Sequence, residues 1–303
     1  MNPIALALLS AAMWGCTDLV TTYVGRRIGS LRVVVIAVTT SVVIAVPVAI
    51  ARGAFSVTYD SAIVGATLIM GVAAGIAYIG VFTAFRLGPL SVVSPTVSAY
   101  GAFAAVLAVF FLGERLTATH LVGVVAVGMG IVLLGLRTTG TGRKRRASLA
   151  SPGVAFAVIG MALFAVITVA LTIPIHEYGW STGIALSRLG NVITVWAIFL
   201  TLRARHTSLP RWARTDLLGE GQRLDRRGIA LAAFVGVADT LAFFVFAAAL
   251  EGGPTWAISL LSSLGPIIVV LGGYFGYGER LRTAQLVGLA SIALGIICAS
   301  LPA

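Results

Sequence analysis

The chain has 303 residues, of which 59% are apolar and only 10% are charged, and its mean hydropathy is +1.04. So little polar surface cannot cover a water-soluble globule of this size, and the composition therefore indicates an integral membrane protein. The formal net charge of +11 would suit a nucleic-acid partner, but the basic residues lie in loops between long apolar stretches, so no nucleic acid is expected.

Apolar stretches long enough to cross a bilayer recur along the whole chain. A transmembrane helix needs about 20 such residues. We therefore predict an all-α polytopic membrane protein with ten transmembrane helices, five in each half: residues 4–25, 33–51, 62–85, 91–112, 119–136, 153–175, 183–202, 229–250, 257–277 and 284–301.

The loop charges predict the side of the membrane on which each loop lies. Only Arg52 and Arg115 fall in loops on one side, whereas nearly all the other Lys and Arg residues fall on the other side. By the positive-inside rule the strongly basic side faces the cytoplasm. We therefore expect a multi-pass protein of the cell (plasma or inner) membrane with both termini outside.

The second half of the chain repeats the first. Gly88-Pro89 returns as Gly253-Pro254, and the Gly-Glu-Arg-Leu run at 113–116 returns at 278–281, with the same shift in residue number. We predict a first five-helix repeat at 1–136, a basic linker at 137–152 and a second five-helix repeat at 153–303.

An odd number of spans in each repeat has a consequence for topology. The second copy must enter the membrane from the opposite side, which gives two inverted repeats that can exchange inward-open and outward-open shapes around a site near the midplane. Since one chain holds both copies, it does not need to dimerise, and a monomer and a homodimer both remain open.

These repeated motifs, together with Trp14-Gly15 in the first span, resemble the EamA group of the drug/metabolite transporter superfamily over nearly the whole chain. The resemblance implies two copies of a five-span domain and transport of small metabolites. It covers exporters and importers of amino acids, nucleobases, other metabolites and drugs, so it names no substrate. Relatives in this superfamily are more often drawn with both termini in the cytoplasm, whereas the loop charges here indicate the reverse.

Charged side chains at bilayer depth are costly unless they face the bundle interior or water, so they are candidates for the transport path. Asp239, near the centre of the eighth span, is a candidate for proton coupling or for contact with a substrate ammonium group; a packing role is the alternative. Asp18 lies one helical turn beyond Trp14 and shares its face, and this pairing suits a cationic or amphipathic solute. Asp18 is the second candidate for proton coupling, and pairing with an Arg is its alternative role.

Arg188, early in the seventh span, resembles an arginine that the family often carries near the start of the second helix of its repeat. A structural ion pair with Asp18 or Asp239 is the expected role. Asn191 comes shortly after it on the same helix face, where its amide can donate or accept hydrogen bonds.

Small polar side chains form a pattern that both halves share. Ser94 and Ser98 in the fourth span are matched in the ninth span by Ser259 and Ser263, with the same shift in residue number as the repeated motifs. We expect this stripe to face the central cavity, with close helix packing as the alternative. Tyr78 and Tyr100 add aromatic surface with a hydroxyl group in the first half.

Two pairs of residues are candidates for gating. Pro95 and Pro266 interrupt the fourth and ninth spans and free backbone carbonyls that can line a cavity or bind solute, with a simple kink of each helix as the alternative. Glu114 and Glu279 follow a glycine at the two Gly-Glu-Arg-Leu runs, where a carboxylate can cap the next helix, pair with its arginine or serve as a matched gate element.

The sequence therefore predicts a secondary transporter that moves a small organic solute, amino acid-like or amphipathic and cationic, by alternating access. Export is the first expectation, and the expected partners are the small-molecule substrate, membrane lipids and protons. The alternative is an integral membrane enzyme that acts on a lipid-linked substrate. The dispersed ionisable residues indicate neither a nucleophile with its base nor a metal site, so we expect no enzyme and no cofactor.

Overall fold

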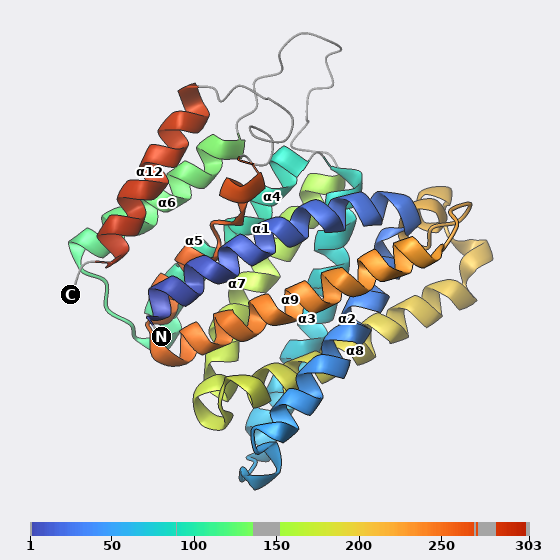
Figure 1. Cartoon of the computed structure of the whole chain (residues 1–303), viewed down its shortest axis with the longest axis horizontal. Helices are drawn as coiled ribbons and strands as arrows, with labels where there is room; N and C mark the ends of the chain where they lie inside the picture. Colours follow the sequence, from blue (N-terminus) through green and yellow to red (C-terminus); the bar gives the residue numbers. More distant parts are fainter. Residues whose placement is uncertain (1, 89, 136–151, 270, 272–282, 301–303) are drawn as a thin grey trace.

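The computed structural model describes residues 2–88, 90–135, 152–269, 271 and 283–300 (Figure 1). The first half contains α1 (Pro3–Ile28), α2 (Ser30–Ala51), α3 (Ser61–Leu87), α4 (Leu90–Ser98), α5 (Tyr100–Leu112) and α6 (Ala118–Gly135). The second half contains α7 (Pro152–Tyr178), α8 (Trp180–Ala204), α9 (Arg226–Gly252), α10 (Thr255–Ser262) and α12 (Thr283–Ser300). The predicted linker at 137–152 lies, apart from Pro152, outside the described residues.

The helices have the length and composition of membrane spans. Seven described stretches are long and apolar enough to cross a bilayer: α1, α2, α3, α7, α8, α9 and the single span Val92–Leu112, which α4 and α5 form together. Three shorter apolar helices, Ala118–Leu133, Thr255–Val269 and Thr283–Cys298, bring the total among the described residues to ten. The predicted fold class, an all-α membrane protein with ten helices, is confirmed.

Polar side chains set the starts of two equivalent helices. The Asp60 carboxylate accepts hydrogen bonds from the backbone N–H groups of Ala62 and Ile63 at the start of α3. Asp225, the equivalent residue of the second repeat, accepts one from Gly228 at the start of α9. Each aspartate satisfies backbone donors that the first helical turn leaves without partners.

The fourth and ninth spans are each broken near the middle. α4 ends at Ser98 and α5 begins at Tyr100, while α10 ends at Ser262 and the chain turns before it becomes helical again at 265. Pro95 lies shortly before the first break, and Pro266 lies in the first turn after the second. Proline has no backbone N–H and its ring crowds the preceding turn, which accounts for the break just before Pro266. The break at Ala99 follows Pro95, and the Ala99 N–H still donates to the Pro95 carbonyl at 3.1 Å.

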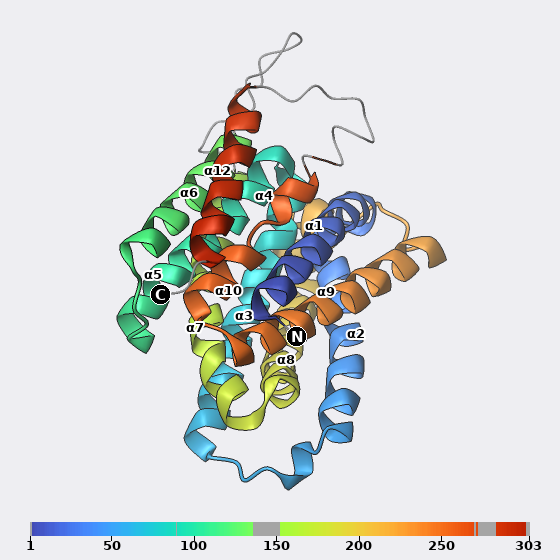
Figure 2. The same ribbon diagram turned by 60° about the vertical axis from the view of Figure 1, so that its left-hand side comes forward.

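Helices of the two halves are interlocked rather than separate. α1 lies along α9, and in the equivalent pair α7 lies along α3; α2 packs on α8, and α6 lies along α12 (Figures 1 and 2). The apolar core therefore runs through the boundary between the two repeats.

Ion pairs and hydrogen bonds tie together the end of the molecule where α1 and α3 finish, which we call the basic end. Arg27 pairs with Asp225, and Arg86 pairs with Asp216 at 3.0 Å. The backbone N–H of Gly228 and the Arg27 guanidinium hold the pKa of the Asp225 carboxyl below its usual range. The segment between α8 and α9 is thus attached to the first repeat.

The opposite end of the molecule carries the α2–α3 and α7–α8 connections. Arg52 lies over the Trp180 ring at 4.7 Å, and the Tyr178 hydroxyl accepts a hydrogen bond from the backbone N–H of Asp60. α1 therefore runs toward the basic end, whereas α7, its equivalent in the second repeat, runs away from it. The two repeats are inverted with respect to each other.

Two glycines allow equivalent close contacts between the repeats. A Cβ at Gly71 would overlap the backbone of α8 at Ser187 and Gly190, and a Cβ at Gly236 would overlap α2 at Ala37 and Thr40. Gly236 is the equivalent of Gly71, with the same difference in residue number as between the repeated motifs. Ser187 and Gly190 are the equivalents of Ala37 and Thr40, but with a smaller difference in residue number. The same helix crossing thus occurs twice. The first two helices of the two repeats are related by this smaller difference in residue number, and the later helices by the larger one.

We expect Gly71→Ala to lower the free energy of unfolding by about 1–3 kcal/mol, because the added methyl group meets backbone that cannot rotate away. Gly236→Ala should behave in the same way. The measurement is detergent-induced unfolding of the purified protein, followed by circular dichroism. Gly65→Ala on α3 is the matched control, since open space surrounds that position and alanine favours the helix; equal stability of the Gly65 and Gly71 variants would contradict the close packing.

Candidate functional site

A buried ion pair lies at the centre of the bundle. Arg188 of α8 donates to the Asp239 carboxylate of α9 at 3.0 Å, and the two side chains are only 4% and 11% exposed. The guanidinium also lies over the rings of Tyr78 and Phe243, at 5.1 and 4.3 Å from their centroids. Of the two acids considered as partners of Arg188, the structure selects Asp239.

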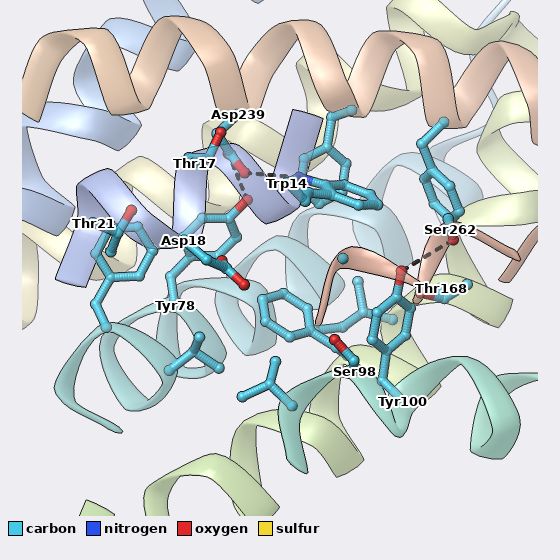
Figure 3. Close-up of a pocket in the computed structure, with 18 of the residues that line it drawn as sticks. Trp14, Thr17, Asp18, Thr21, Tyr78, Ser98, Tyr100, Thr168, Asp239 and Ser262 are labelled. Carbon is cyan, nitrogen blue, oxygen red and sulfur yellow. Dashed lines mark hydrogen bonds between the residues drawn. The ribbon is translucent and has the colours of Figure 1, made fainter. Parts of the chain in front are cut away.

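Two aromatic side chains from the first repeat complete the coordination of Asp239. The Trp14 indole N–H donates to Oδ1 at 3.2 Å, and the Tyr78 hydroxyl donates to Oδ2 at 2.7 Å (Figure 3). Asp239 therefore accepts hydrogen bonds from helices α1, α3 and α8. These contacts connect α9 to the other three helices at one side chain.

A cavity of about 100 Å³ opens beside this cluster. Its lining includes side chains from α1, α3, α7 and α9 and from the two broken spans: Trp14, Thr17, Asp18, Thr21, Tyr78, Val81, Phe82, Phe85, Val97, Ser98, Tyr100, Phe164, Ile167, Thr168, Leu171, Asp239, Phe243, Phe246, Ser262 and Gly265. Most of the wall is aromatic or aliphatic, with a few convergent polar groups, as is typical of sites for small organic molecules.

Asp18 is the second carboxylate of the cavity. It lies one turn beyond Trp14 on α1, as predicted from the sequence, and its carboxylate points into the space between Tyr78 and Tyr100 (Figure 3). The Ser94 hydroxyl donates to Oδ2 at 3.3 Å. In the part of the chain that the structure describes, no Lys, Arg or His pairs with Asp18.

The two broken spans contact each other at the wall of the cavity. Ser98 and Tyr100 lie at the break between α4 and α5, and the Tyr100 hydroxyl lies 3.1 Å from that of Ser262 at the end of α10. The breaks thus lie at the cavity wall, where non-helical backbone at membrane depth is surrounded by protein instead of lipid.

Several candidates from the sequence lie beside the cavity but do not line it. Ser259 and Ser263 return their hydroxyls to the carbonyls of Thr255 and Leu260, and both lie against Gly101 of α5. This position agrees with the packing alternative for the serine stripe in the second half. The prolines of the two breaks, Pro95 and Pro266, are also absent from the lining.

Asn191 lies on α8 between the glycine contact of Gly71 and the packed Gly75. It is 1% exposed, and neither polar atom of its side chain has a hydrogen-bond partner among the described residues. The Ser41 hydroxyl, at the equivalent position of α2, is buried and unpartnered in the same way. The structure places Asn191 at the crossing of α8 with α3 and not in the cavity.

Glu114 contacts the other repeat. Its two carboxylate oxygens accept hydrogen bonds from the backbone N–H groups of Thr255 and Trp256, at 2.7 and 2.9 Å. The carboxylate thus caps α10 instead of its own following helix, α6. Its counterpart Glu279 lies outside the described residues.

Other cavity residues were not recognised in the sequence, among them Thr17, Thr21, Phe164, Thr168, Phe243, Phe246 and Ser262. A comparison of the two repeats at both differences in residue number would have revealed several of them as equivalents of candidate residues. Phe164 and Thr168 correspond to Trp14 and Asp18 at the smaller shift, and Phe243 corresponds to Tyr78 at the larger one. Among the described residues, no three His, Cys, Asp or Glu side chains gather as a metal site would require.

Comparisons with known proteins agree with this architecture. A crystal structure described only as that of a protein is 17% identical, with a TM-score of 0.72 over 98% of this chain and 96% of the other, which shows a shared fold. The comparison with curated proteins gives no match. The family model of the EamA-like transporter family matches residues 1–136 and again residues 151–301. The chain therefore belongs to the EamA-like transporter family, as its repeated motifs predicted.

Proposed function

We propose that this protein is a secondary transporter that carries a small organic solute across the cell membrane through the central cavity, by alternating access of its two repeats. One observation carries the proposal: equivalent positions of both repeats line the cavity, in the pairs Trp14 and Phe164, Asp18 and Thr168, Tyr78 and Phe243, Val97 and Ser262, and Tyr100 and Gly265. A site on the axis that relates two inverted repeats can be reached from either side as the repeats exchange shapes.

The proposed domains are the two five-helix repeats at 1–136 and 153–303 with the basic linker at 137–152 between them. Both repeats of one chain supply the cavity, so a monomer is a sufficient transport unit.

Export is the proposed direction. Along α3 the lining extends to Phe82 and Phe85, toward the basic end, whereas the equivalent Ala247 and Leu250 on α9 are absent from the lining. The positive-inside rule assigns the basic end to the cytoplasm and both termini to the outside. A solute from the cytoplasm would then enter along α3.

Proton coupling is proposed to use Asp18 in preference to Asp239. Asp239 is neutralised by Arg188 and saturated by Trp14 and Tyr78. The groups that face Asp18 from the neighbouring helices are the Ser94 hydroxyl, Tyr78, Tyr100 and the neutralised Asp239. Asp18 can therefore release a proton and bind a cationic solute in its place, and no arginine loses its counterion in this exchange.

The test is uptake by proteoliposomes with and without an imposed pH gradient, with amino acids and permanently charged organic cations as solutes. Electroneutral exchange of one proton for one monovalent cation should accumulate that cation about tenfold for each pH unit. We expect Asp18→Asn to abolish this accumulation.

Asp60→Asn is the matched control, because it makes the same change in a carboxylate outside the cavity lining, and asparagine can still cap α3 there. It should retain accumulation. Gradient-driven uptake that persists in Asp18→Asn would remove Asp18 from coupling, and the absence of uptake for every solute class would contradict transport.

A further inference from the structure

The charges around the cavity restrict what it can bind. Asp239 lies at its edge, but Arg188 neutralises it at 3.0 Å, and Trp14 and Tyr78 occupy both of its oxygens. A ligand that competed for Asp239 would leave Arg188 buried without its counterion, which is strongly unfavourable at this depth. Asp239 is therefore not available to a solute.

No cation of the described chain is available to a solute either. The lining contains no Lys, Arg or His. Arg188 lies behind the rings of Tyr78 and Phe243 and is engaged with Asp239. A carboxylate or phosphate brought into the cavity would find hydroxyl groups but no positive charge, and its desolvation would go uncompensated. This disfavours amino acids and other zwitterions, which the sequence had left open.

Asp18, unlike Asp239, is available to a cationic solute. Its carboxylate accepts a hydrogen bond from Ser94 at 3.3 Å, and it also faces the cavity. A positive charge placed there would meet a carboxylate that no described cation neutralises. The rings of Trp14, Tyr78, Tyr100 and Phe164 surround the same space, and aromatic faces attract organic cations.

The size and shape of the cavity indicate how such a cation would lie. The volume of about 100 Å³ is smaller than the roughly 150 Å³ cavity known to hold a benzene ring. This volume suits the ammonium group beside Asp18 and not a whole aromatic amine, so the apolar body of the ligand would have to extend beyond it, past Phe82 and Phe85 toward the basic end. A second charged group on that body would face an apolar wall.

We propose that the cavity binds an amphipathic organic monocation, a protonated amine or quaternary ammonium with an aromatic or aliphatic body, whose charge pairs with Asp18. This inference rests on the proposed function, because it names the substrate class of the same cavity. It also excludes zwitterionic amino acids as the main substrates.

The experiment compares three ligands that share a phenylethyl body and differ in their polar groups: phenethylamine carries an ammonium, phenylalanine an ammonium and a carboxylate, and 2-phenylethanol an uncharged hydroxyl. Binding to the purified full-length protein in detergent is measured by isothermal titration calorimetry. We expect phenethylamine to bind at least tenfold more tightly than either of the others. Asp18→Asn should lose this preference, whereas Asp60→Asn, which makes the same change in a helix-capping carboxylate outside the cavity lining, should keep it. Equal or tighter binding of phenylalanine, or unchanged amine binding by Asp18→Asn, would overturn the proposal.

A second measurement uses the wild-type protein and serves the case in which the Asp18 variant does not fold. An apolar carbodiimide should modify Asp18, and mass spectrometry follows the extent of the reaction. The trimethylammonium analogue of phenethylamine, which has no N–H to react with the activated carboxyl, should slow it at least severalfold and 2-phenylethanol should not; equal protection by both, or by neither, contradicts the inference.

Transport and substrate class can fail separately. Asp18-dependent amine binding without uptake of any solute would refute transport and leave the substrate class standing. Uptake of phenylalanine or phenylethanol without amine binding would support transport and refute the substrate class.

Discussion

Replacing Arg188 with Met is expected to destabilise the protein by about 3–5 kcal/mol, because it leaves the Asp239 carboxylate buried without its cation. Asp239→Leu should cost a similar amount, since the guanidinium would then keep only the rings of Tyr78 and Phe243. The double variant should be more stable than Arg188→Met, because two apolar side chains of similar size leave no unpaired charge in the core. Unfolding in mixed detergent micelles, followed by circular dichroism, measures all three.

The exposed pair of Arg27 and Asp225 provides the comparison. These side chains are 35% and 40% exposed, so water and salt screen their attraction, and Arg27→Met should destabilise the protein far less than Arg188→Met. If the double variant at the central pair is no more stable than Arg188→Met alone, the two residues do not act as a compensating pair. A small effect of Arg188→Met would show that the central carboxylate does not depend on that arginine.

The sequence contained most of the architecture because the chemistry of a bilayer leaves few choices. Long apolar stretches must form helices, and two copies with an odd number of spans must be inverted. Trp14 and Asp18 were placed on one face by helical spacing alone, and both line the cavity. These features depend on local periodicity, which a single sequence displays directly.

Long-range partners could not be derived in this way. Nothing near Asp239 in the sequence identifies Arg188, Trp14 and Tyr78 as its partners, because these contacts join residues that are far apart along the chain. Phe164 and Thr168 were missed for a different reason. The connection between α8 and α9 is longer than that between α2 and α3, so the shift between equivalent positions grows within the repeat. A comparison of the repeats at the difference in residue number that fits the later helices therefore misses the equivalent residues of the first two helices.

The two repeats nonetheless differ in their charged residues at equivalent positions. At the corresponding positions of the other repeat, Asp18 is matched by Thr168, Asp239 by Ala74 and Arg188 by Val38. The packing glycines of α3 and α9, in contrast, are kept in both halves. The repeats therefore share their helix contacts while each charged group of the site occurs once, which allows one cavity to hold a single charge-specific site on a symmetric frame.

Glu114→Ala is expected to favour opening of the end of the molecule opposite the basic end. Glu114 joins the start of the α5–α6 connection to the start of α10, through two hydrogen bonds to backbone N–H groups of the other repeat. α10 begins beside the start of α1, where Gly253 lies against Pro3. This contact therefore holds the two repeats together at that end.

The size of the effect follows from the type of hydrogen bond. A bond to a charged group contributes about 1.5–3 kcal/mol, so losing both should shift an equilibrium between closed and open shapes by roughly a hundredfold or more. Glu114→Gln should have an intermediate effect, because its amide retains one oxygen as an acceptor. Under the proposed alternating access, both variants should bring the cavity into contact with water on the side that the positive-inside rule assigns to the outside.

The measurement is the rate at which a membrane-impermeant thiol reagent modifies Leu171→Cys in oriented vesicles, in a background without Cys16 and Cys298. Leu171 lines the cavity on α7, which runs toward the end that Glu114 holds. Labelling from that side should rise in the order wild type, Glu114→Gln, Glu114→Ala. Glu177→Ala removes an exposed carboxylate at the same end of α7 and should leave the rate unchanged. If Glu114→Ala labels no faster than Glu177→Ala, the capping of α10 by Glu114 stabilises a helix end and does not control access to the cavity.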